Sequence, residues 1–182
     1  MKKDFFVAPV CEAALILVAG MAAWLTQVPL LFASLGPTAF EMTETPERNS
    51  ARPYNVIVGH LIGVIAGFVA LAATDAWRTP AVSTHSISLL RVWASVIAAL
   101  LTVAGTLMAR ATQPAALSTT LVIATGSMQR LVDGPIIMAA ILLITLVGEP
   151  LRRWRLKHRD TSPAQPWRDA VRRRGARSHV KE

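Results

Sequence analysis

The sequence has almost no cysteine and no side-chain arrangement that is typical of an active site. Cys11 is the single cysteine among 182 residues, so the chain can form neither an internal disulfide framework nor a cysteine-based metal site. No set of nucleophile, histidine and acid can be placed together, and neither a phosphate-binding loop nor a metal-ligand spacing occurs. We therefore expect no enzymatic activity, no catalytic residue, and no metal or other cofactor.

Charge is scarce over most of the chain, and the net charge comes from one end. Residues 1–151 hold eight basic and eight acidic residues, whereas residues 152–182 hold eleven basic and three acidic ones, which supply the whole net charge of +8. No basic-aromatic pattern or nucleic-acid fold motif accompanies this charge, so we expect no nucleic-acid partner. We interpret residues 151–182 as a basic, disordered cytoplasmic tail.

What the chain does have is long apolar sequence. It is 53% hydrophobic with a mean hydropathy of +0.44, which is more apolar than the about 45–50% of a soluble domain. About 20 apolar residues are needed to cross the ~30 Å of hydrocarbon in a bilayer. Four stretches reach that length, at residues 5–26, 54–74, 87–109 and 131–148. The sequence therefore predicts an integral membrane protein that lies in the lipid bilayer.

Two shorter apolar runs, at residues 28–40 and 114–125, complete the pattern. About a dozen residues are too few to span a bilayer comfortably, and re-entrant half-helices are typical of such lengths. The order long, short, long thus occurs twice, and shortened segments at matching places in two halves indicate a transport site; a chance match of two connectors is the alternative. We predict an all-α membrane domain over residues 1–150, with four transmembrane helices and two short re-entrant half-helices.

The membrane topology depends on these short runs. If both re-enter, four helices span the membrane; if both cross, there are six spans and the halves are inverted repeats. Segment length favours re-entry, whereas Arg48 and Arg52 favour crossing, because re-entry puts them outside. In either case the termini share a side. The basic tail predicts that this side is cytoplasmic, in a multi-pass protein of the inner (plasma) membrane.

The short runs and the helix after the first one hold the densest uncharged polar side chains. Broken helices expose free backbone N–H groups and the positive end of a helix dipole, which favour a small anion. The candidate substrate-binding or pathway residues are Ser34, Gly36, Pro37, Thr38, Asn55, Gly59, His60, Gln113, Pro114, Ser118 and Thr119. Glycines at positions 59, 63 and 67 share one helix face, which we interpret as a close-packing face; a backbone-lined pore wall is the alternative.

Titratable side chains within the predicted spans require partners or a route to water. His60 is either a proton relay or anion donor, or a buried histidine bonded to a backbone carbonyl, and the sequence does not decide between these roles. Glu12 and Arg91 each lie just within the first long helix of a half. We expect both to reach the cytoplasmic surface, with mutual pairing or a polar substrate as the alternative.

Three stretches resemble the signatures of the HPP family of integral membrane proteins. Residues 34–40 read SLGPTAF, residues 53–63 read PYNVIVGHLIG, and residues 113–121 read QPAALSTTL. The resemblance implies a compact domain with four transmembrane helices, and plant-chloroplast and cyanobacterial relatives are associated with nitrite transport. Where the family has His-Pro-Pro-Ala-Gly-Ala-Thr, this chain has QPAALST, and the glutamine cannot carry a positive charge near neutral pH.

Taken together, these patterns predict a small transporter or channel that passes a small anion such as nitrite, assembled as a homo-oligomer. The alternative is a non-transporting membrane scaffold or regulatory protein whose basic tail binds lipid or a protein partner.

Overall fold

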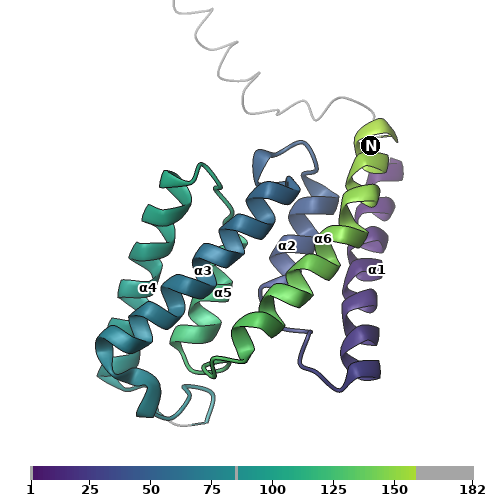
Figure 1. Ribbon diagram of the computed structural model, residues 1–182. Helices are drawn as coiled ribbons and strands as arrows, with labels where there is room; N and C mark the ends of the chain where they lie inside the picture. The colour runs from purple at the N-terminus through teal and green to yellow at the C-terminus, as the bar shows by residue number, and fades with distance from the viewer. Residues whose placement is uncertain (1, 85, 159–182) are drawn as a thin grey trace, which may run out of the picture.

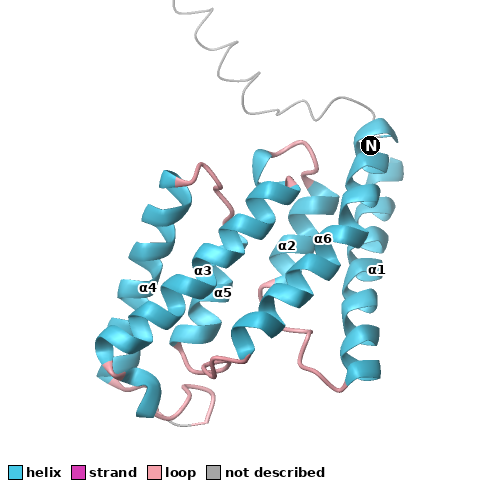
Figure 2. Cartoon of the chain, viewed as in Figure 1, coloured by secondary structure: helices cyan, strands magenta, loops and turns pink. Residues whose placement is uncertain are grey.

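The computed structural model describes residues 2–84 and 86–158, which form helices and loops without any strand (Figure 2). Two single 3-10 turns, η1 (Asn49–Ala51) and η2 (Ala76–Arg78), lie in the connections. The α-helices of these parts are α1 (Lys2–Thr26), α2 (Leu35–Glu44), α3 (Pro53–Thr74), α4 (Leu89–Met108), α5 (Ala115–Ala124) and α6 (Asp133–His158). The all-α fold class is therefore confirmed.

Four of these helices, α1, α3, α4 and α6, are long and apolar enough to cross a membrane, as the sequence predicts. They have between 20 and 26 residues in their apolar segments, and at 1.5 Å per residue this matches a hydrocarbon core of about 30 Å. The helices α2 and α5 have ten residues each. Each half of the chain therefore consists of a long, a short and a long helix.

The short helices connect opposite ends of the bundle (Figure 1). The chain leaves α1 at the lower end, returns inward along residues 27–34, and follows α2 to the upper end, where α3 begins. In the second half, α4 ends at the upper end and α5 leads down to the start of α6. Re-entry is thus not confirmed, and the path agrees with the crossing alternative, in which the two halves run in opposite directions.

Side chains of neighbouring helices donate hydrogen bonds to backbone carbonyls at each end of the bundle. At the upper end, Arg152 Nη1 donates to the carbonyl of Pro46 at 2.8 Å, and Arg155 Nε donates to the carbonyl of Thr43 at 3.0 Å. These arginines belong to the C-terminal turns of α6, which stays helical through His158. The first eight residues of the predicted tail are thus helical, and residues 159–182 lie outside the described residues.

Arg91 connects the loops at the lower end through hydrogen bonds. Its side chain is 1% exposed and donates to the carbonyls of Thr79 at 2.6 Å, Pro80 at 3.3 Å and Ala124 at 3.0 Å. The expected pairing of Arg91 with Glu12 is therefore wrong, and its guanidinium is covered by the surrounding connections instead of lying open at a surface. The start of α4 lies at the end of the bundle opposite to the start of α1 (Figure 1).

The glycine face of α3 packs directly on α5. A Cβ atom at Gly59 would lie 2.6 Å from Gln113 Cβ, and one at Gly63 would lie 2.7 Å from the Ala116 carbonyl oxygen. The predicted role in close helix packing is confirmed. The alternative of a pore wall is wrong for this face, because α5 covers it.

Candidate functional site

A cluster of polar side chains joins both short helices to α3 in the interior. Ser34 precedes α2, Thr38 lies on α2, His60 lies on α3 and Thr119 lies on α5. Each of the four is 0% exposed. Residues from the two halves of the chain, as much as 85 positions apart, therefore meet at one buried point.

His60 lies between two hydroxyl groups. Its Nδ1 is 2.7 Å from Thr119 Oγ1, and its Nε2 is 3.0 Å from Thr38 Oγ1. The Thr119 hydroxyl donates to Ser34 Oγ at 2.8 Å, and the Thr38 hydroxyl donates to the Ser34 carbonyl at 2.9 Å. These four contacts close a ring that contains all the polar side chains of the cluster.

The hydrogen bonds of this ring can be satisfied whether His60 is neutral or protonated. A neutral imidazole donates from one nitrogen and accepts at the other, so Nδ1–H can donate to Thr119 while the Thr38 hydroxyl turns to Nε2. A charged imidazolium donates from both nitrogens, and both threonines then donate to Ser34. Conversion of one state into the other therefore needs one proton from outside the ring, together with the rotation of one hydroxyl group.

Gln113 occupies a second polar site nearer the upper end. Its Nε2 donates to the Ser50 carbonyl at 3.2 Å, and its Oε1 accepts from the Ala115 amide at 3.4 Å. The side chain is 3% exposed. Gln113 thus caps the start of α5 and ties it to the loop that contains η1.

Glu41 is a candidate residue that the sequence analysis missed. Its carboxyl group contacts the side chains of Gln113 and Ser50, it is 8% exposed, and its Oε2 has no hydrogen-bond partner among the described residues. Glu41 follows Thr38 by three positions on α2, so both lie on one helix face. That spacing was a usable signal, but Glu41 lies one position beyond the apolar run at residues 28–40.

The remaining predicted residues are not members of the ring around His60. Asn55 Nδ2 donates to the Thr112 carbonyl at 3.4 Å, which ties α3 to the segment before α5, and Gly59 is a packing position against Gln113. The exposed or half-buried members are Gly36, Pro37, Pro114 and Ser118. Their roles in a pathway stay predictions.

A second pair of hydroxyl groups, those of Thr102 and Thr120, lies next to the ring. Thr120 follows Thr119 on α5 and lies 2.7 Å from Thr102 of α4, oxygen to oxygen. The Thr120 hydroxyl also lies 3.2 Å from the Gly63 carbonyl of α3. This pair extends the polar contacts of α5 to both of its long neighbours.

Comparison with known protein families shows which family the chain belongs to. The family model described as "HPP, transmembrane region" matches residues 2–151. The chain belongs to the HPP family. No curated protein and no solved structure matches it. The HPP region thus includes both short helices, the ring around His60, and the position of Gln113.

Proposed function

We propose that this HPP protein is a transporter or channel for a small anion such as nitrite, which passes where α2, α3 and α5 meet. The observation that supports this most strongly is His60 between Thr38 and Thr119. The ring consists of hydroxyl and imidazole groups, all of which can donate hydrogen bonds to an anion. The start of α2 beside Ser34 adds the positive end of a helix dipole.

The ring is fully buried, so passage requires the two halves to separate there. A ligand site between inverted repeats, built partly from discontinuous helices, is typical of transporters that alternate access between two sides. When the hydroxyls of Thr38 and Thr119 release Ser34, they become donors for an anion. The anion thereby replaces contacts that otherwise hold the halves together.

Loop charge supports an orientation with both termini in the cytoplasm. Arg48, Arg52 and Arg110 lie in upper-end connections, on the side of the basic last turns of α6. The lower-end connections hold Arg78 and Arg130. By the positive-inside rule the upper end is cytoplasmic, and we assign the protein to the plasma membrane.

The test is anion flux in proteoliposomes. Wild-type protein is expected to carry nitrite. His60→Ala is expected to reduce the flux by about tenfold or more, because the buried hydroxyls of Thr38 and Thr119 lose the imidazole as a hydrogen-bond partner. Thr106→Val is the matched control, since Thr106 is a buried threonine whose hydroxyl bonds only within α4.

The folding of each variant is checked by its thermal unfolding and gel-filtration profile. Wild-type protein that carries neither nitrite nor any other small anion would contradict the proposal and favour the scaffold alternative. Equal flux through wild type and a folded His60→Ala variant would contradict the assigned pathway.

A further inference from the structure

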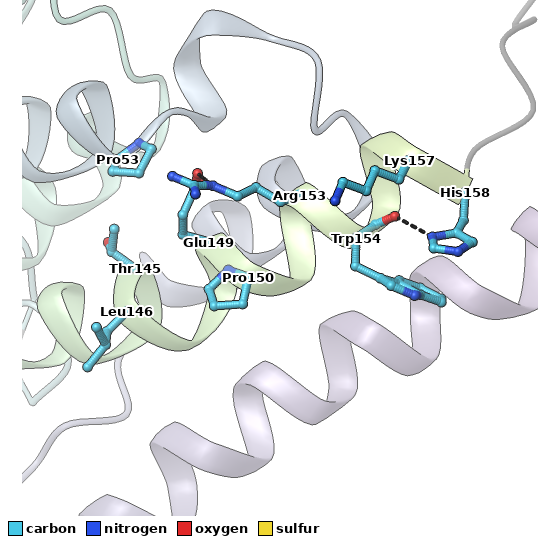
Figure 3. Close-up of a pocket in the computed structure, with 9 residues that line it drawn as sticks. All are labelled: Pro53, Thr145, Leu146, Glu149, Pro150, Arg153, Trp154, Lys157 and His158. Carbon is cyan, nitrogen blue, oxygen red and sulfur yellow. Dashed lines mark hydrogen bonds and ion pairs between the residues drawn. The ribbon is translucent and has the colours of Figure 1, made fainter.

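We propose that the C-terminal half of α6 carries a binding site for an anionic diacyl phospholipid, separate from the ring around His60. An open groove of about 670 Å³ runs along α6 beside the start of α3 (Figure 3). Its lining residues are Pro53, Thr145, Leu146, Glu149, Pro150, Arg153, Trp154, Lys157 and His158. All of them except Pro53 belong to α6, at the upper end of the bundle.

The groove changes from apolar to basic along the helix. Leu146, Pro150, Arg153 and Lys157 are spaced by three or four positions, so they form one stripe on α6. Leu146 is 76% exposed at the membrane-side end of the stripe, and the two basic residues lie at the other end. A phospholipid has the same order, with acyl chains in the hydrocarbon and a phosphate at the surface.

The acid in the groove is neutralised by its neighbours. Glu149 accepts from Arg152 at 2.7 and 3.0 Å and from Arg153 Nε at 2.7 Å. The side chain of Arg153 is nevertheless 72% exposed, and Lys157 is exposed as well. Positive charge therefore remains available for a phosphate group, and Glu149 positions Arg153 toward the groove.

A second, apolar groove adjoins the first. It has a volume of about 380 Å³, lies between α1 and α6, and shares Pro150 and Trp154 with the basic groove. Its other lining residues are Ala14, Leu15, Val18, Val147 and Leu151. Two grooves that meet at Pro150 and Trp154 fit the two acyl chains of one lipid.

Trp154 marks the depth of the headgroup. Its ring is stacked on that of His158 with 5.0 Å between centroids (Figure 3), and tryptophan is enriched at the membrane–water interface. The cytoplasmic leaflet is rich in anionic lipids, which attract basic residues next to the membrane. The position of Trp154, the basic side chains and the shape of the two grooves thus all favour an anionic phospholipid. A second copy of this chain could bind the same basic residues only through an acidic surface.

The test is native mass spectrometry of the full chain in detergent, titrated with dioleoyl phosphatidylglycerol, dioleoyl phosphatidylcholine or inorganic phosphate. We expect phosphatidylglycerol to bind, and phosphatidylcholine and phosphate to bind much more weakly. Arg153→Gln and Lys157→Gln are each expected to weaken binding about fivefold, because one cation near the surface is lost. Arg78→Gln, which removes an exposed cation at the lower end, is expected to leave the affinity unchanged.

Several results would overturn the lipid site. These are equal binding of phosphatidylcholine, displacement of the lipid by inorganic phosphate, or a folded Arg153→Gln, Lys157→Gln double variant that binds phosphatidylglycerol as tightly as wild type. A double variant that changes the oligomeric mass and leaves lipid binding intact would also overturn it, in favour of contact between copies.

Discussion

At the scale of single residues, His60 holds the two halves of the chain together. Its ring contacts Thr38 from the first half and Thr119 from the second. A buried polar group that loses its partner costs about 1–3 kcal/mol, so opening the ring is unfavourable unless another group replaces the lost bonds. In the proposed function, an anion at the same position would supply that replacement and so link binding to opening.

Glu41 bears on what accompanies the anion. In the proposed pathway, an ionised carboxylate at Glu41, which is 8% exposed and contacts Gln113, would repel an anion that approaches the ring. A proton on the free oxygen removes that repulsion and satisfies a buried polar atom. If the proposed anion passes Glu41, protonation of this carboxylate is therefore expected to favour its passage.

Glu41→Gln is expected to make anion flux independent of pH. In wild-type protein, nitrite flux should rise as the pH falls on the Glu41 side, because protonation neutralises the carboxylate. Glutamine is neutral at every pH and keeps much of the shape, so its flux should stay near the acidic wild-type level. Flux is measured over mildly acidic to mildly alkaline pH, with protein-free liposomes subtracted for the permeation of nitrous acid. Identical pH profiles for the two proteins would refute this role.

At the scale of elements, the contact between α3 and α5 fixes the position of His60. Gly63→Leu is expected to lower the unfolding free energy by about 1–3 kcal/mol or more through overpacking, because its Cβ would lie 2.7 Å from a backbone oxygen. Gly36→Ala on α2 is the control, since nothing lies within 4 Å of its Cβ. Thermal unfolding in detergent checks both. A Gly63→Leu variant as stable as Gly36→Ala would mean that this contact is not tight.

Apolar length and glycine spacing were enough to predict the four long helices and the packing face of α3. These features depend on local sequence, because hydrocarbon thickness and helix periodicity apply to each segment alone. The direction of the short segments could not be predicted in the same way. It depends on the connection over residues 27–34, whose path is set by tertiary contacts.

The site could be predicted only in part, because it also depends on tertiary contacts. The sequence indicated Ser34, Thr38, His60 and Thr119 because they are polar residues in apolar surroundings. Their pairing depends on α3 packing between the two short helices, which no local pattern specifies. Glu41 was missed because α2 continues through Glu44, beyond the apolar run that defined it.

At the scale of the whole molecule, the crossing path makes a prediction about sidedness. In a Cys11→Ala background, Asn49→Cys is expected to resist a membrane-impermeant maleimide in intact cells, and Ser83→Cys is expected to react. Both positions are exposed in loops, at the upper and lower end respectively (Figure 1). Labelling after cell lysis controls for the reactivity of each thiol. The opposite pattern would contradict the crossing path with cytoplasmic termini.

The central claim, that the halves separate around His60 as an anion passes, is tested most directly by a reversible cross-link. Ser34 Oγ and Thr119 Oγ1 are 2.8 Å apart, so Ser34→Cys with Thr119→Cys in the Cys11→Ala background places two thiols within reach of a disulfide. Nitrite flux through proteoliposomes is measured before oxidation, after oxidation and after reduction, with each single cysteine variant as control. The claim predicts that oxidation stops flux in the double variant alone and that reduction restores it. Unchanged flux through the fully cross-linked protein would contradict it.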